Sequence, residues 1–342
     1  MVVNLPKNTK NKKFISKGEK ETSDDSDFDE LDDFDEMDLD QDFFTREFSK
    51  PQFSRTMNRE DASVMDKHRE KKKFKSEDSS TTDSVFDLST SKIIYRFISK
   101  RYIKGLDGVI STGKEANVYF AEALDLSLTD NQHFLAVKVY RTRTLDFKKI
   151  KAYIAGDRRF SKRTGRKSHQ IIQQWALKEF KNLQRALEAG LSVPKPLEVR
   201  RNVLLMEFIG RDKLAAPTLH NIRKESKFLE VAADIYTQLL ENMKVLWKKA
   251  DLVHGDLSEY NILGLFPEDP NGKLKYYIID ISQAVLTSHP AANQLLLRDI
   301  NNINIFFDTL NVEVPVLPLE VIYKNITNYE PKMTDLLRFE NF

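Results

Sequence analysis

The stretch His254-Gly-Asp-Leu-Ser-Glu-Tyr-Asn261 decides how the rest of the chain is interpreted. An aspartate followed five residues later by an asparagine has the spacing of a phosphotransferase catalytic loop. In such a loop Asp256 accepts the proton of an attacking hydroxyl, and the amide oxygen of Asn261 binds a metal ion. His254 is expected to pack underneath and hold the loop. The alternative is an ordinary turn in which Asp256 is a cap, and the neighbouring motifs weigh against it.

A second aspartate ends an apolar run, Lys275-Tyr-Tyr-Ile-Ile-Asp280. The turn residues Pro267–Gly272 predict a hairpin, which brings Asp280 back beside Asn261. There the two side chains can hold Mg²⁺ against the phosphates of ATP. Kinases usually continue this aspartate with Phe-Gly, whereas here Ile-Ser-Gln follows at 281–283. A buried capping aspartate is therefore the alternative interpretation.

One lysine, Lys138, interrupts the apolar strand Phe134-Leu-Ala-Val-Lys-Val-Tyr140. This pattern is typical of the kinase strand whose lysine binds ATP phosphates. A lysine on a buried strand needs an anionic partner, because an unpaired buried charge is costly. Glu179 is the favoured partner, since it shares a predicted helix with apolar residues that bury the other face. Glu188, near the end of the same helix, is the weaker alternative.

The stretch Ile110-Ser-Thr-Gly-Lys-Glu-Ala-Asn-Val-Tyr119 lies between two predicted strands, where a phosphate-covering loop belongs. It contains one glycine, so it fits neither G-x-G-x-x-G nor the Walker pattern. Backbone amides near Gly113, together with Ser111 and Lys114, are nevertheless candidates to contact phosphates.

The stretch Asn202-Val-Leu-Leu-Met-Glu-Phe-Ile-Gly210 is typical of a strand that runs into the linker between two kinase lobes. In that arrangement the backbone of Glu207 and Ile209 hydrogen-bonds adenine, and Met206 lines the pocket behind it. A plain edge strand followed by a turn is the alternative.

Coarse periodicity places short elements around these motifs. We expect a helix over 92–103 that stops before Gly105, strands at 108–111, 117–121, 134–140, 192–199 and 202–208, and helices over 173–189 and 228–250. Five strands with one helix among them, followed by helices, predict an α+β fold with a small β-rich lobe and a larger helical lobe. The boundaries are about 89–206 for the N-lobe and about 210–342 for the C-lobe.

The chain has 342 residues and a formal net charge of +2, which averages two opposite regions. Residues 21–42 contain 13 acidic residues and no lysine or arginine, so the remaining 320 residues carry +15. Residues 1–88 lack sustained periodicity, and we expect them to form a disordered tail. The absence of cysteine excludes disulfides, a thiol nucleophile and cysteine-based zinc sites. With no apolar leader and no apolar run long enough for a bilayer, we expect a soluble intracellular protein that does not act at a membrane.

A basic stretch over 141–167 contains eleven lysines and arginines against two acids, with aromatic residues interleaved. These are Arg141, Arg143, Lys148, Lys149, Lys151, Arg158, Arg159, Lys162, Arg163, Arg166 and Lys167, with Phe147, Tyr153 and Phe160 among them. Such a composition is typical of a phosphate-binding surface, in preference to a merely solvated loop.

The 111–119 loop, the 254–261 loop and Ile279-Asp-Ile-Ser-Gln283 together closely resemble the RIO family of atypical serine/threonine kinases, and within it the Rio-one subfamily. The resemblance covers about residues 89–340 and leaves out the tail. It implies a bilobal protein-kinase-like fold that begins with an extra helix. It also implies that the protein uses ATP and Mg²⁺.

Carried over residue by residue, Lys138 resembles the family's ATP-phosphate lysine and Glu179 its ion-pair partner. Asp256 resembles the catalytic base, and Asn261 and Asp280 resemble the metal ligands. In this family the second aspartate, here Asp280, is also implicated as a phospho-acceptor during ATP hydrolysis. The family's implied partners are late precursors of the small (40S) ribosomal subunit with their assembly factors. With such partners, the resemblance implies that the basic stretch over 141–167 contacts ribosomal RNA. We therefore expect the protein in the cytoplasm, with passage through the nucleus.

Two other functions compete with this one. A small-molecule kinase of the aminoglycoside or choline type also uses a His-Gly-Asp loop, but the 111–117 loop and the short C-terminal lobe argue against it. A catalytically silent ATP-binding scaffold would bind partners without turnover. The presence of every expected catalytic residue gives the scaffold interpretation no support.

Overall fold

The structure is a computed structural model that describes residues 86–125, 134–141, 147–160, 167–267, 269 and 272–339. The acidic stretch 21–42 and the remainder of the predicted tail up to residue 85 lie outside this part of the chain. The first helix starts slightly before the predicted boundary at 89, because the Asp87 carboxylate caps it by accepting from the Thr90 N–H at 2.8 Å. Among the described helices, none combines the length and apolar character that crossing a membrane requires.

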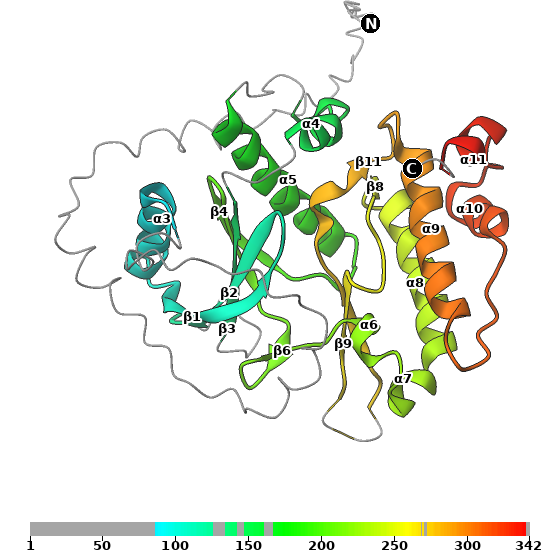
Figure 1. Ribbon diagram of the computed structural model, residues 1–342, viewed down its shortest axis with the longest axis horizontal. Helices are drawn as coiled ribbons and strands as arrows, with labels where there is room; N and C mark the ends of the chain where they lie inside the picture. The colour runs from blue at the N-terminus through cyan, green and yellow to red at the C-terminus, as the bar shows by residue number, and fades with distance from the viewer. Residues whose placement is uncertain are drawn as a thin grey trace, which may run out of the picture. The chain divides into compact units, whose positions relative to one another are not determined.

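A five-stranded antiparallel sheet forms the first lobe (Figure 1). In spatial order its strands are β1 (Ile103–Thr112), β2 (Ala116–Ala123), β3 (Phe134–Tyr140), β5 (Val203–Glu207) and β4 (Pro196–Arg200). All five predicted strands are present, and β3 has the predicted ends. β3 pairs with β2 over its whole length without a register shift, which fixes the direction in which each β3 side chain points.

The alternation of side-chain direction along β3 explains why Lys138 points away from the apolar cluster. Every second residue of β3 over Leu135–Val139 packs in a hydrophobic cluster beneath α3 (Leu88–Ser99). Lys138 lies between two of these residues and therefore points to the opposite face of the sheet. That face looks toward α5 (Ser168–Glu188), which supplies the partner of Lys138.

The first helix ends earlier than predicted. The expected helix over 92–103 was wrong at its C-terminal end, because α3 stops at Ser99 and Arg101 takes a left-handed conformation with φ of 60°. Ile103 is then the first residue of β1 and is fully buried in the sheet cluster. Burial of Ile103 against α3 thus outweighs the helical periodicity of the sequence.

The basic stretch contains a helix, α4 (Phe147–Ala155), followed by a turn that reaches residue 160. Two residues counted toward an RNA surface face the interior here. Phe160 is buried, and the Arg159 guanidinium is bonded to the fully buried Asp157 carboxylate. Residues Arg143, Lys162, Arg163 and Arg166 lie outside the described part of the chain.

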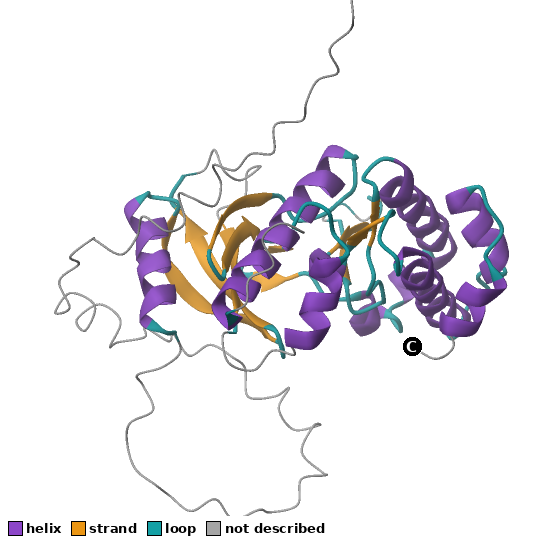
Figure 2. Ribbon diagram, turned by 90° about the horizontal axis from the view of Figure 1, so that it is seen from above, coloured by secondary structure: helices purple, strands orange, loops and turns teal. Residues whose placement is uncertain are grey.

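The second lobe is mainly helical, which confirms the predicted α+β bilobal class (Figure 2). After β5 comes a small hairpin of β6 (Gly210–Arg211) and β7 (Leu214–Ala215). The helices are α6 (Leu219–Ile222), α7 (Ser226–Leu229), α8 (Ala232–Lys248), α9 (Ala292–Asp308), α10 (Leu319–Thr327) and α11 (Met333–Phe339). The helix expected over 228–250 is thus split into α7 and α8. One large apolar cluster joins α8, α9 and α10 to the short strands beside them.

Two short pairs of antiparallel strands hold the predicted catalytic segments. β8 (Leu252–Val253) pairs with β11 (Val285–Leu286), and β9 (Ile262–Leu265) pairs with β10 (Lys275–Ile278). The 254–261 loop therefore lies between β8 and β9, at one end of both pairs. The chain leaves β10 at the same end, which delivers the second aspartate to that loop.

Candidate active site

The ammonium of Lys138 is the centre of the site. Its Nζ donates to Glu179 Oε1 at 2.8 Å and to Asp280 Oδ1 at 2.9 Å. The Lys138 and Glu179 side chains are 9% and 2% exposed, whereas that of Asp280 is 46% exposed. The predicted pairing with Glu179 is thus observed, and Glu188 is not the partner. Three residues from distant parts of the sequence meet where the two lobes join.

Lys138 and Asp280 stabilise each other's charge, whereas burial and the nearby Asp280 raise the pKa of Glu179 to about 7, against the opposing effect of Lys138. Burial alone would lower the pKa of Lys138, but Asp280 and Glu179 raise it above the ordinary value, so the lysine is charged. Burial would likewise raise the pKa of Asp280, but the Lys138 ammonium and the Ser282 hydroxyl hold it below its ordinary value. The site therefore presents an ionised, half-exposed carboxylate at neutral pH.

Asp280 has an unusual backbone conformation. It lies between β10 and a 3₁₀ turn, η4 (Ile281–Gln283), with φ of 56°. The Ser282 hydroxyl donates to Asp280 Oδ1 at 3.0 Å, and this is the same oxygen that Lys138 holds. Among the described residues, no donor contacts Asp280 Oδ2. One carboxylate oxygen is therefore fixed by the protein, while the other remains available to a ligand.

Asn261 lies beside the same turn. The Ile279 N–H donates to the Asn261 carbonyl at 2.9 Å, next to the paired residues Ile262 and Ile278. This is the proximity to Asp280 that the predicted hairpin required. The Asn261 side-chain nitrogen donates to the Asp256 carbonyl at 2.7 Å, so the amide oxygen is the group that remains to bind a ligand.

The residues at this turn suit magnesium. In the described part of the chain, no cluster of three or more His, Asp or Glu side chains is arranged to hold a metal. Mg²⁺ does not need such a cage, because it is usually held by one or two protein oxygens together with phosphates and water. The free carboxylate oxygen of Asp280 and the amide oxygen of Asn261 are hard ligands of the required kind.

The His254 side chain contacts the loop that carries Asp256 and stabilises it. The buried imidazole accepts from the Asp256 N–H at 3.3 Å through Nδ1 and contacts the Ile279 carbonyl at 3.2 Å through Nε2. Burial lowers the pKa of His254 to about 4, so the ring is neutral at physiological pH. Gln283 donates to Asp256 Oδ2 at 3.0 Å and links the loop to the turn after Asp280.

A residue that no sequence motif points to, Asp299, fixes the same loop. Its buried carboxylate on α9 accepts from the Gly255 N–H at 2.8 Å and from the Leu257 N–H at 2.9 Å. The neighbouring Arg298 donates to the Gly255 carbonyl. The adjacent Arg298 and Asp299 on α9 were the only signal in the sequence, and they do not reveal the partner.

The 111–117 loop forms the tight turn between β1 and β2. The Gly113 N–H donates to the Ala116 carbonyl at 2.9 Å, so this amide closes the hairpin instead of remaining open to a phosphate. Ser111 and Lys114 are exposed at the turn. A phosphate contact of this loop would therefore use groups other than the Gly113 amide, such as the exposed Ser111 and Lys114 side chains.

The linker predicted to bind adenine follows β5. Glu207 lies opposite Leu135 in the sheet, and its N–H donates to the Lys195 carbonyl. The Ile209 carbonyl accepts from the Ala216 N–H at 2.9 Å, while the described backbone offers no acceptor to the Ile209 N–H. Met206 is partly buried at the boundary of two apolar clusters.

A comparison with models of known protein families shows the family to which the chain belongs. The model of the RIO domain family matches residues 117–318, which include every residue of the Lys138 triad and the 254–261 loop. The chain belongs to the RIO family. This RIO chain is 38% identical to the RIO-type serine/threonine-protein kinase Rio1 of Methanocaldococcus jannaschii, over 74% of the chain and 79% of that protein.

Longer relatives carry the same names. The RIO chain is 38% identical to the serine/threonine-protein kinase RIO1 of Caenorhabditis elegans, over 73% of this chain but 46% of that protein. It is 37% identical to the human serine/threonine-protein kinase RIO1, over 75% of this chain and 42% of that protein. The chain thus spans less than half the length of these two relatives. The names support the first RIO subfamily.

A solved structure also resembles the RIO chain. The Rio2 kinase-ADP/Mg²⁺-phosphoaspartate complex from Chaetomium thermophilum superposes with a TM-score of 0.51, covering 70% of this chain and 67% of that chain. The two sequences are 20% identical, so the likeness speaks for the shared fold alone.

Proposed function

We propose that the chain is an ATP-dependent atypical serine/threonine kinase and ATPase. The observation that carries the proposal is the double ion pair of Lys138, which donates to both Glu179 and Asp280. This arrangement provides a charged lysine for ATP phosphates and a half-exposed carboxylate for a metal ion. The names of the relatives at 37–40% identity, all serine/threonine-protein kinases, support the same activity.

Each side chain of the site is then assigned a role in catalysis. Asp256 accepts the proton of the attacking hydroxyl or water. Lys138 binds the phosphates, and Glu179 keeps it in place. Asn261 and Asp280 hold Mg²⁺, which when bound neutralises charge that develops on the phosphates.

Adenine is proposed to bind at the linker after β5. The Glu207 carbonyl and the Ile209 N–H would bond its edge, and Met206 would contact its face. Ser111 and Lys114, at the tip of the β1–β2 turn, would cover the phosphates. The open Ile209 N–H supports this assignment, since a buried amide needs an acceptor.

Asp280 is further proposed as a phospho-acceptor. Its Oδ2 would attack the γ-phosphorus, the bond from that phosphorus to the bridging oxygen would break, and ADP would leave. Water would then release phosphate and restore the carboxylate. The Rio2 kinase of Chaetomium thermophilum, solved as an ADP/Mg²⁺-phosphoaspartate complex, supports this route.

The test is ATP hydrolysis by the full chain in Mg²⁺, with Asp256→Asn and Asp280→Ala beside the wild type. We expect Asp256→Asn to lose ~100-fold or more in rate, since a positioned acid or base contributes about that factor. Asp280→Ala should also lose turnover, because it removes a metal ligand and the proposed phospho-acceptor. Asp280→Ala should also abolish incorporation of label from γ-labelled ATP into a hydroxylamine-sensitive form. The exposed Asp308→Asn is the matched control. Unimpaired hydrolysis by either variant would contradict the assignment, and a wild type that binds ATP without turnover would favour a scaffold.

The partners are proposed to be pre-40S ribosomal particles with their assembly factors, and the location the cytoplasm with passage through the nucleus. The basic stretch supports contact with ribosomal RNA through residues that remain exposed on α4 and the turn after it, such as Lys148 and Arg158. The partner assignment predicts that purified pre-40S particles accelerate ATP turnover. An equal turnover rate with and without these particles would count against it.

A further inference from the structure

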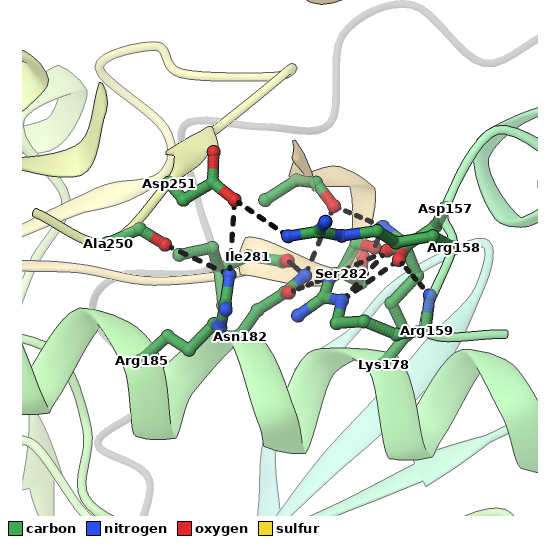
Figure 3. Close-up of polar contacts among 11 residues, drawn as sticks. Asp157, Arg158, Arg159, Lys178, Asn182, Arg185, Ala250, Asp251, Ile281 and Ser282 are labelled. Carbon is green, nitrogen blue, oxygen red and sulfur yellow. Dashed lines mark hydrogen bonds and ion pairs between the residues drawn. The ribbon is translucent and has the colours of Figure 1, made fainter. Parts of the chain in front are cut away.

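Helix α5 contacts the segment after Asp280 as well as the lysine in front of it. Lys178, the neighbour of Glu179, is fully buried and donates to the Ser282 carbonyl at 2.9 Å and to the Ala284 carbonyl. Figure 3 shows Lys178 on α5 directed at the turn that contains Ser282. Neighbouring residues of one helix thus contact Lys138, which holds the Asp280 carboxylate, and the turn that follows Asp280.

Asn182 lies one helical turn beyond Lys178 and therefore on the same face of α5. Its side-chain nitrogen donates to the Ile281 carbonyl at 3.0 Å and to the Ala284 carbonyl at 3.2 Å. Its oxygen accepts from Arg159 Nη2 at 2.8 Å, which fixes the orientation of the amide (Figure 3). The carbonyls of Ile281, Ser282 and Ala284 are therefore held by side chains of α5.

The burial of the Lys178 ammonium indicates that this side chain fixes the position of the backbone that it contacts. A buried ammonium loses its hydration, and the free-energy cost of that loss is large unless other interactions compensate for it. Burial lowers the pKa of Lys178 to about 7, against the opposing effect of the nearby Asp157 carboxylate. A methionine would fill the same space without that loss. The ammonium instead donates to backbone carbonyls of the turn, which is how a side chain fixes backbone position.

We propose that Lys178 and Asn182 are positioning residues that hold the turn after Asp280 so that its free carboxylate oxygen faces the metal and the γ-phosphate. The left-handed conformation of Asp280 is unfavourable for a non-glycine residue and persists only where its surroundings enforce it. Lys138 and Ser282 fix the carboxylate, and the two α5 side chains fix the backbone beyond it. The inference rests on the proposed function, because it assigns these residues to magnesium-dependent binding of ATP.

The test is calorimetric titration of the full chain with ATP, once in Mg²⁺ and once in EDTA. The variants are Lys178→Met and Asn182→Ala, with Gln184→Ala on an exposed position of α5 as the control. We expect Lys178→Met and Asn182→Ala to weaken binding ~10- to 100-fold in Mg²⁺, the usual effect of losing a group that orients a metal ligand. Binding in EDTA should be unchanged. Because Asn182→Ala retains the buried Lys178, it remains informative where Lys178→Met fails to fold.

A double-mutant cycle separates positioning from general stability. In the Asp280→Ala background, Lys178→Met and Asn182→Ala should cause no further loss, because they act only through Asp280. Equal losses in Mg²⁺ and EDTA, or losses that add to that of Asp280→Ala, would overturn the positioning role. A wild type that binds ATP no better in Mg²⁺ than in EDTA would instead refute the proposed function itself.

Discussion

At the scale of single residues, the site depends on groups that are held in otherwise unfavourable states. Asp280 occupies the left-handed region, at a cost of about 1 kcal/mol for a non-glycine residue. Lys138 and Glu179 are both buried, and each would be destabilising without the other. These costs are offset only when all three side chains are in place, so the arrangement is sensitive to the loss of any one of them.

The buried His254 predicts a dependence of stability on pH. Burial lowers its pKa from 6.5 to about 4, a difference that corresponds to about 3 kcal/mol. Protonation therefore favours the unfolded chain, and the free energy of unfolding should fall as the pH drops from about 6.5 to about 4. Denaturant unfolding across this range should show a shallower fall for His254→Asn, whereas the exposed His169→Asn should follow the wild type. An identical fall in His254→Asn and the wild type would exclude His254 as the cause.

At the scale of elements, local patterns identified most strands and helices but not all of their ends. The alternation of β3 predicted both its extent and the isolated lysine, because one face of that strand is uniformly apolar. The end of α3 was missed, because Ile103 fits a helical stripe equally well and only its burial in β1 decides. Asp299, Lys178 and Asn182 escaped notice because their partners are backbone groups, which leave no mark in the sequence.

The β6–β7 hairpin gives an element-scale prediction. A Cβ at Gly210 would lie 2.2 Å from the Leu214 carbonyl oxygen and 2.6 Å from the Phe208 ring. Gly210→Ala should therefore lower the free energy of unfolding by ~1–3 kcal/mol and weaken ATP binding, because Ile209 precedes it. Gly108→Ala is the matched control, since its Cβ would meet nothing within 4 Å. Urea unfolding that shows both variants equally stable would disprove this close packing.

At the scale of the whole molecule, the opposite charges of the 21–42 stretch and the remaining chain are the main feature that the fold does not explain. Composition alone predicted the basic surface, but the structure divides its residues between surface and interior. Lys148 and Arg158 are exposed, with Arg158 also 4.0 Å from the Asp251 carboxylate, whereas Arg159 is bonded to the buried Asp157 and to Asn182. A charge reversal at Arg159 would therefore disturb the interior as well as any interaction with RNA.

RNA binding should depend on the exposed cations. The double variant Lys148→Glu with Arg158→Glu should bind ribosomal RNA more weakly, and the slope of log K against log salt should become shallower by about one for each phosphate that is no longer neutralised. Reversal of two exposed lysines elsewhere, Lys227→Glu with Lys332→Glu, should change both quantities less. Filter-binding measurements at several salt concentrations give the affinity and the slope for each double variant. Equal slopes in the two double variants would exclude the basic stretch as the RNA-binding surface.

The acidic stretch 21–42 predicts competition between the tail and RNA for the basic surface. A tail whose residues 21–42 hold 13 acids would compete with RNA for the basic surface, so deletion of residues 1–85 should tighten RNA binding at low salt. The effect should vanish at high salt, where both interactions are screened. Unchanged affinity at low salt would show that the tail does not act on this surface.

The central claim is that the double ion pair of Lys138 belongs to an ATP site, and ATP binding by Lys138→Met tests it most directly. The variant keeps most of the length of the side chain but removes the charge that contacts Glu179 and Asp280. Titration of the full chain with ATP in Mg²⁺ should show binding by the wild type and by the exposed Lys332→Met control, and a loss of ~10-fold or more in Lys138→Met. Equal affinity of Lys138→Met and the wild type would contradict the account.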